Sequence, residues 1–291
     1  MTVLDAEVPA LWQGLGLPGL VDVHVHFMPK QVMDKVWAYF DAAGPLTGTE
    51  WPIAYRTEET DRLERLRGFG VRAFPSLVYA HKPGMAAWLN AWAADFAGQH
   101  DDVLHTMTIY PEPGVLAYVD QALSSGARIV KVHVQVGAYD PRDPLLDEVW
   151  GVLADAAIPV VTHCGSGPAP GEFTGPGPFG EVLARHPTLT AVIAHRGMPE
   201  YDAFLSLARS YPRVHLDTTM AFTDFVERQA PFPPSLRPLL LDLQDRVLFG
   251  SDFPNIPHPF SHQLAALQRL DLGDDWLRAV LHDNGARLLG L

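Results

Sequence analysis

Polar side chains alternate with valines near the start of the chain, in the stretch LVDVHVHF at residues 20–27. Asp22, His24 and His26 occupy every second position, so a β-strand would place all three on one face. Burying an imidazole or a carboxylate without a partner costs free energy, and a strand core offers few partners. Two imidazoles on one strand could instead bind a single metal ion, and this is the chemistry that the spacing suggests.

Three later motifs supply further groups of the same kind. His163 follows valines in VVTHCG, His195 lies in VIAHRG, and Asp252 lies in LFGSDFP. Three neutral imidazoles and one carboxylate suit a zinc-like divalent ion with at least one position left for water. The predicted metal ligands are His24, His26, His163 and Asp252. Each histidine alone could be a satisfied core residue, so the prediction depends on the set.

The elements that must position these groups alternate along the chain. Eight strand-like runs are separated by amphipathic segments, in which apolar residues recur at spacings of three and four. Such alternation predicts right-handed βαβ crossovers and a parallel sheet. Eight units in 291 residues predict a single-domain α/β protein, a (β/α)8 TIM barrel covering residues 1–291. A doubly wound open sheet is the alternative, but no GxGxxG follows the first strand.

A barrel of this kind brings the motifs together, because active-site groups lie at the C-terminal ends of its strands. His24 and His26 end the first predicted strand, and His163, His195 and Asp252 end the fifth, sixth and eighth. We therefore expect the five side chains to converge on one end of the barrel.

Composition limits the partners. The formal net charge of −13 argues against nucleic acid and against an anionic membrane surface, since both are polyanions. No apolar run reaches the roughly 18 residues that span a bilayer, and acidic residues stand where a secretory signal would be basic. We expect a cytoplasmic protein with a small-molecule substrate, with a homodimer as a reasonable assembly. The single cysteine, Cys164, excludes an intrachain disulfide.

The order of the motifs along the chain is similar to that of a known group of proteins. LVDVHVHF comes first, VLFGSDFPN comes last, and the chain ends in DNGARLLGL. This arrangement resembles the amidohydrolase superfamily, and more narrowly the amidohydrolase-related branch that includes aminocarboxymuconate-semialdehyde decarboxylase. The resemblance implies a (β/α)8 barrel with the four ligands named above. It also implies that His195 is a second catalytic residue beside Asp252, near the ion but not necessarily bound to it.

The fourth predicted strand, RIVKVHVQV, decides between one metal and two. Binuclear members of the superfamily bridge two metals with a carbamylated lysine, and Lys131 is the candidate here. A bridging lysine must lie at the strand's end, but His133 and Gln135 lie nearer that end. We therefore predict one divalent ion, with zinc first and manganese, iron or cobalt as alternatives. His133 is then a substrate contact, a residue that supports a ligand, or a core histidine.

Weaker candidates surround this set. Besides His133, the residues that could face a substrate are Arg56, His81 and Arg196, and any of these three could simply be solvated. Alternation turns Cys164 away from the ion, so we read it as a packing residue. Asp22 could either orient an imidazole or have a structural hydrogen-bonding role. Asp217 could either line the pocket or cap the following turn. Apolar pocket walls could come from Trp51, Tyr79 and Phe173.

Three functions fit these residues. The first is a metal-dependent hydrolase that attacks a small amide, ester or lactone with metal-activated water, Asp252 acting as base and His195 polarising the carbonyl. The second is a non-oxidative decarboxylase of an unsaturated or aromatic acid, which needs a cation for the substrate carboxylate; Arg56 and Arg196 are the sequence's candidates. The third is a barrel that binds metal without catalysis. Substrate identity is not encoded in the fold.

Overall fold

The computed structural model describes residues 4–291, apart from the side chains of residues 46 and 47. The chain forms two compact units. Unit 1 comprises the described residues up to Phe74 together with Asp217–Leu291, and unit 2 comprises Pro75–Leu216. Each unit contains strands alternating with helices, as the sequence pattern predicts.

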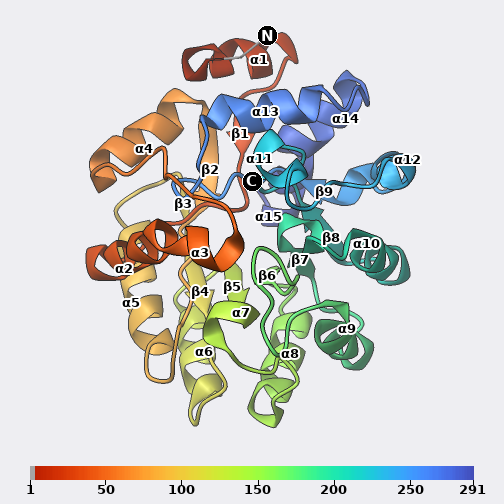
Figure 1. Cartoon of the computed structure of the whole chain (residues 1–291). Helices are drawn as coiled ribbons and strands as arrows, with labels where there is room; N and C mark the ends of the chain where they lie inside the picture. Colours follow the sequence, from red (N-terminus) through yellow and green to blue (C-terminus); the bar gives the residue numbers. More distant parts are fainter. Residues whose placement is uncertain (1–3) are drawn as a thin grey trace. The chain divides into compact units, whose positions relative to one another are not determined.

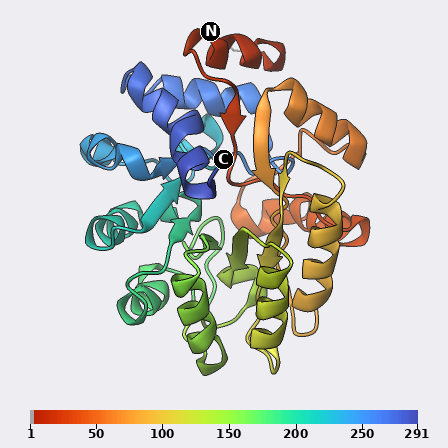
Figure 2. The same cartoon turned by 180° about the vertical axis from the view of Figure 1, so that it is seen from behind.

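Unit 2 contains a run of parallel strands in sequence order. The pairs β4–β5, β5–β6, β6–β7 and β7–β8 are all parallel. The strands are β3 (Val103–Leu104), β4 (Thr106–Thr108), β5 (Ile129–His133), β6 (Val160–His163), β7 (Ala191–Ile193) and β8 (Val214–Asp217). The main helices, which lie along the outside of the strands in Figures 1 and 2, are α5 (Ala86–Ala97), α6 (Val115–Ser124), α8 (Pro144–Asp155), α9 (Pro176–Arg185) and α10 (Tyr201–Ser210).

Local sequence explains why these helices form. In α8, the buried residues Leu146, Val149, Trp150 and Leu153 recur at helical spacing and make one apolar face. The carboxylate of Asp143 accepts a hydrogen bond from the backbone N–H of Leu145 and so caps the helix, with proline at its first position. β7, most of β5 and half of β6 consist of buried Val, Ile and Ala, as expected where both faces of a parallel sheet are covered, whereas β4 is Thr-Met-Thr.

Unit 1 contains β1 (Leu20–Val21), β2 (Val71–Pro75) and β9 (Val247–Leu248). β1 pairs with β2 in parallel, and the Val23 N–H donates to the Phe249 carbonyl just beyond β9. The helices of this unit are α1 (Val8–Gly14), α2 (Lys30–Asp41), α3 (Ala43–Thr47), α4 (Glu59–Gly68), α11 (Asp224–Glu227), α12 (Arg237–Asp242), α13 (Phe260–Gln268), α14 (Asp274–Arg278) and α15 (Asn284–Leu289). α1 and α13 lie side by side in Figures 1 and 2.

The first strand is shorter than the motif LVDVHVHF predicts. β1 ends at Val21, and beyond it the pairing continues through single backbone hydrogen bonds from Asp22 to Ala73 and from Val23 to Phe249 and through an isolated bridge between Val25 and Phe253. The cause is a side chain: the Asp22 carboxylate accepts the backbone N–H of His24, which a continuous strand would give to its neighbour. The segment that carries the candidate ligands His24 and His26 is therefore not part of a regular strand.

Other predicted runs also end early. The run ARIVKVHVQV stops being a strand at His133, and Gln135 lies in the short helix α7 (Val134–Gly137). The predicted strand RIVKVHVQV is therefore wrong in including Gln135. His133 is the last strand residue, which keeps Lys131 away from the strand's end. Among residues 4–291, no helix is both long and apolar enough to cross a membrane.

Candidate metal centre

Three of the four predicted ligands lie together in unit 1. His24, His26 and Asp252 are buried, and one ligand atom from each lies within 4.8 Å of the other two. The Asp252 Oδ1 atom is 3.0 Å from the His26 Nε2 atom and 3.6 Å from the His24 Nε2 atom. Two imidazoles and a carboxylate directed at one point are ligands of the kind that a divalent transition metal prefers. The residues present thus fit such an ion.

The backbone of Asp252 has the left-handed conformation, with φ of 71°. Such a conformation costs a residue with a side chain roughly 1–2 kcal/mol, so surrounding interactions must hold it. The Asp252 N–H donates to the His24 carbonyl at 2.9 Å, and its own carbonyl accepts the Asn255 N–H at 2.8 Å. These bonds tie the turn after β9 to the strand that carries His24.

Asp22 connects the two segments that carry the ligands. Its Oδ1 atom accepts the N–H groups of His24 at 3.0 Å and Ser251 at 3.1 Å. The residue is fully buried, and burial raises the pKa of its carboxyl to about 8 against the opposing hydrogen bonds from Ser251 and His24. Asp22 therefore fixes the backbone on both sides of the candidate site.

Asp217 acts on the ring of His24 instead. Its Oδ2 atom lies 2.8 Å from the His24 Nδ1 atom, and both residues are buried. Its Oδ1 atom accepts the Thr219 N–H at 3.1 Å, so the capping role considered for Asp217 is also present. The sequence could have suggested the His24 contact only through the position of Asp217 at the end of a strand.

Unit 2 gathers the other predicted histidines. The rings of His133 and His163 stack with centroids 4.1 Å apart, and the His195 ring lies 4.7 Å from that of His163. Tyr79 extends the cluster, because its ring lies 5.0 Å from His133 and 5.1 Å from His81. The structure therefore brings four predicted site histidines into one chain of ring contacts.

Backbone groups set the roles of two of these imidazoles. The His163 Nε2 atom is 2.8 Å from the Gly167 carbonyl oxygen, which can only accept, so Nε2 carries a hydrogen and Nδ1 is the nitrogen able to bind a metal. His133 Nδ1 accepts the Val136 N–H at 3.3 Å. That His163 is the fourth ligand stays a prediction.

His195 lies beyond its strand, in a 3-10 segment at Ala194–Gly197. His195 and Arg196 both have φ of 51°, so the alternation expected of a strand does not apply to them. Arg196 is fully buried, with its guanidinium carbon 5.8 Å from the ring centroid of Tyr201. The motif VIAHRG therefore ends in a strained turn, which is a common feature of functional loops.

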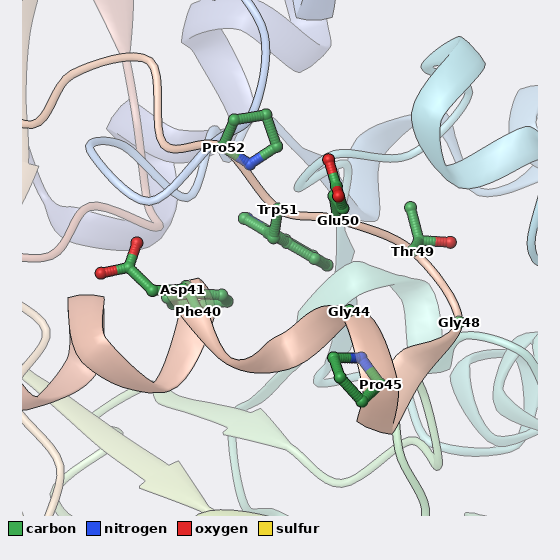
Figure 3. Close-up of a pocket in the computed structure, with 9 residues that line it drawn as sticks. All are labelled: Phe40, Asp41, Gly44, Pro45, Gly48, Thr49, Glu50, Trp51 and Pro52. Atoms are coloured by element: carbon green, nitrogen blue, oxygen red, sulfur yellow. The ribbon is translucent and has the colours of Figure 1, made fainter.

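Arg56 has a partner within unit 1. Its Nη1 atom lies 2.7 Å and 2.8 Å from the two carboxylate oxygens of Asp41, and the pair is exposed. Asp41 lines an open pocket of about 490 Å³ in the insertion between the His24–His26 motif and α4 (residues 29–58). The residues around the pocket are Phe40, Asp41, Gly44, Pro45, Gly48, Thr49, Glu50, Trp51 and Pro52. Figure 3 shows Glu50, Trp51 and Pro52 on an extended segment that faces the helical residues across this pocket.

Asn255 joins this insertion to the turn that carries Asp252. The Trp51 Nε1–H donates to the Asn255 carbonyl at 2.7 Å, and the Trp37 Nε1–H donates to the Asn255 side-chain oxygen at 3.0 Å. Trp51 also contacts Phe40 and Phe225 through its ring. The predicted wall residue Trp51 thus lines a pocket, while the role of Asn255 was missed because nothing in its spacing marks it.

Burial explains the remaining candidates. Burial raises the pKa of the Cys164 thiol to about 12, which keeps it protonated and agrees with a packing role. Lys131 is fully buried within β5. His258, which the sequence did not single out, is buried in the loop after β9, and desolvation lowers its pKa to about 4. It lies six residues after Asp252, a position that could have drawn attention to it.

Comparison with known proteins gives one family and many structural relatives. A family model described as amidohydrolase matches residues 21–291. An uncharacterised TIM-barrel protein from Bordetella bronchiseptica has a TM-score of 0.76 at 20% identity, covering 93% of this chain and 98% of that one. A comparison with curated proteins finds no match.

Two further structures have named activities. A probable 2-pyrone-4,6-dicarboxylic acid hydrolase from Acinetobacter baumannii matches with a TM-score of 0.61 at 14% identity, over 94% of this chain and all of that one. A 5-carboxyvanillate decarboxylase from Novosphingobium aromaticivorans, complexed with manganese, matches with a TM-score of 0.61 at 14% identity, over 95% and 97% of the two chains. At these identities the likeness establishes the fold, and it confirms the predicted (β/α)8 barrel.

Proposed function

Because the chain belongs to the amidohydrolase family, we propose that it is a metal-dependent hydrolase of a small organic substrate with an amide, ester or lactone carbonyl. The observation that carries the proposal is the convergence of His24, His26 and Asp252 on one point. A purely structural strand would not direct two imidazoles at one buried carboxylate oxygen, since each polar group would be desolvated for little gain.

The proposed ion is one divalent metal, zinc first, with manganese, iron or cobalt as alternatives. His24, His26 and Asp252 would hold it, and we propose His163 as the fourth ligand on the strength of its motif. A bound divalent ion supplies Lewis acidity and lowers the pKa of a coordinated water towards 7.

The chain's own groups would move the proton. A carboxylate oxygen of Asp252 is the acceptor best placed to take a proton from the attacking water, because its Oδ1 atom lies 3.0 Å from His26 Nε2 and 3.6 Å from His24 Nε2, beside the ion that these residues would hold. His195 would stabilise the negative charge that develops on the carbonyl oxygen, as imidazole or imidazolium. Both roles follow from the motifs and remain proposals.

Decarboxylation is the alternative, and it needs a cation that binds the substrate carboxylate. The two predicted arginines are poorly suited to binding one, because Arg56 is engaged by both oxygens of Asp41 and Arg196 is fully buried beside Tyr201. This observation favours hydrolysis. His133 and His81 remain proposed substrate contacts within the histidine cluster of unit 2.

A substrate panel tests the proposal. The protein loaded with zinc or manganese would be incubated with lactones, amides, esters and unsaturated or aromatic carboxylic acids, while hydrolysis and carbon dioxide release are followed. We expect metal-dependent hydrolysis of a member of the panel, lost in the His24→Ala, His26→Ala variant. Carbon dioxide release would support the decarboxylase instead, and no turnover across the panel would support a metal-binding barrel without catalysis.

A further inference from the structure

We propose that Asp217 is a positioning residue that fixes the tautomer of His24, holding the proton on Nδ1 so that the lone pair of Nε2 faces Asp252. The inference rests on the proposed metal site for its consequence, but the tautomer itself can be measured without a metal. Asp217 lies at the end of β8 and does not belong to the predicted ligand set.

The contact defines which nitrogen carries the proton. An ionised carboxylate can only accept hydrogen bonds, so the 2.8 Å approach of Asp217 Oδ2 to His24 Nδ1 requires a hydrogen on Nδ1. In neutral imidazole the other nitrogen is then an acceptor. That nitrogen, Nε2, lies 3.6 Å from Asp252 Oδ1. A metal ion bound by both His24 and Asp252 would therefore meet the lone pair of Nε2.

The orientation of the Asp217 carboxylate is itself fixed. Its second oxygen accepts the Thr219 N–H at 3.1 Å, so the carboxylate cannot rotate without losing a buried hydrogen bond. Gly250 packs against the same groups: a β-carbon there would lie 2.8 Å from the His24 β-carbon and 3.4 Å from the Asp217 carboxyl carbon. The absence of a side chain at Gly250 thus lets the ring of His24 and the carboxylate of Asp217 meet.

The variant Asp217→Asn distinguishes a role in fixing the His24 tautomer from a role in packing alone. In Asp217→Asn, the amide oxygen should remain with the Thr219 N–H, because an amide NH2 group cannot accept a hydrogen bond. The NH2 group then faces His24 Nδ1, which must become the acceptor. The proton moves to Nε2, and the lone pair needed by a metal is lost. A role in packing alone predicts the opposite, because asparagine matches the shape of aspartate and alanine does not.

Metal affinity gives the first test. Dissociation constants for zinc would be measured by chelator competition for the wild type, Asp217→Ala, Asp217→Asn and the control Asp224→Asn, which removes an exposed carboxylate of unit 1. We expect Asp217→Ala to bind about 10- to 100-fold more weakly. Asp217→Asn should bind at least as weakly as Asp217→Ala, and the control should be unchanged. Wild-type affinity in Asp217→Asn would overturn the inference.

Nitrogen NMR of the metal-free protein gives the second test. With ¹⁵N-labelled histidine, at a pH where the His24 ring shows one protonated and one unprotonated nitrogen, we expect His24 to carry its proton on Nδ1 in the wild type and on Nε2 in Asp217→Asn. A wild-type His24 protonated on Nε2 overturns the inference even if Asp217→Asn does not fold. If the wild type shows the expected tautomer but binds no metal, the proposed function fails while the positioning role stands.

Discussion

The two units hold their histidines in different ways. In unit 1, His24 lies between two carboxylates, Asp217 at Nδ1 and Asp252 at Nε2. In unit 2, His133, His163 and His195 contact one another through their rings, and backbone groups bind two of them. Carboxylates fix both the tautomer and the direction of an imidazole and favour a nearby cation, whereas the ring contacts and backbone bonds in unit 2 set only how the imidazoles are oriented.

This difference suggests that the histidines of the two units have different roles. Under the proposed function, the carboxylates in unit 1 would favour a bound cation, and the rings in unit 2 would contact an organic substrate. His163 is the test case, because its motif predicts a ligand while its neighbours resemble those of a substrate-contacting group.

The largest effect is expected at Asp252. Asp252→Asn is nearly isosteric, so the fold should survive, but asparagine can neither carry the charge nor accept the proton. We expect turnover by the metal-saturated variant to fall by roughly 10²- to 10⁴-fold, the usual contribution of a general base. The measurement is the rate on the substrate found by the panel. Turnover near that of the wild type would transfer the role of base to another group, with His195 first.

His163 and His133 test the difference between the two units directly, because their rings stack on one another. If His163 is a ligand, His163→Ala should weaken zinc binding by more than the roughly 10- to 100-fold expected for a residue that only orients a ligand. His133→Ala should leave zinc affinity unchanged and raise KM. Chelator competition and steady-state kinetics on the two variants check this. Equal metal affinities would confine the metal site to unit 1.

His258 is a histidine of unit 1 whose hydrogen bond is to a backbone carbonyl, and its pKa makes the stability of the fold depend on pH. Its Nδ1 lies 3.0 Å from the Pro259 carbonyl, and burial lowers its pKa from 6.5 to about 4. Below pH 6.5 the unfolded chain binds a proton that the folded state refuses, so stability falls as the pH drops towards 4 and is constant above 6.5. The loss is at most roughly 3 kcal/mol.

The variant His258→Asn isolates this contribution, since its amide can replace the hydrogen bond to Pro259 but does not titrate in this range. Urea unfolding of both proteins at several pH values gives the measurement. We expect the wild type to lose stability relative to His258→Asn only between about pH 6.5 and 4. A pH-independent difference between them would show that His258 is not buried in its neutral form.

The smallest effect is expected at Gly250. In Gly250→Ala the new β-carbon would meet the Thr219 hydroxyl and lie 2.8 Å from the His24 β-carbon, so the strand carrying His24 must shift. We expect a loss of about 1–3 kcal/mol in the free energy of unfolding, with weaker metal binding. Gly14→Ala is the control, because no atom lies within 4 Å of its added carbon. An unchanged metal affinity would mean that the site tolerates movement of His24.

Much of the fold and part of the site could be predicted from the sequence. Alternating apolar runs predict the elements because burial imposes their periods, and the spacing of His24 and His26 predicts their shared face. Contacts far apart in sequence could not be predicted. Asp217 meets His24 across 193 positions, and Asn255 meets Trp51 across 204, and no local pattern encodes either pair.

The local backbone conformation could not be predicted from the sequence pattern either. The left-handed turns at His195 and Asp252 break the alternation on which side-chain directions were predicted. Residues with side chains rarely adopt this conformation, so periodicity does not anticipate it. Two of the left-handed positions, His195 and Asp252, carry candidate catalytic groups, as expected where function overrides local preference.

The most direct test of the account is the metal content of the purified protein, measured by elemental analysis after loading with zinc or manganese. The variants are His24→Ala with His26→Ala, and a control pair of half-buried histidines, His100→Ala with His262→Ala. We predict about one ion per chain in the wild type and the control, and none in the first variant, which should stay folded. Two ions per chain with a modified Lys131 would contradict the single-metal site. No metal in the wild type would contradict any metal site at His24, His26 and Asp252.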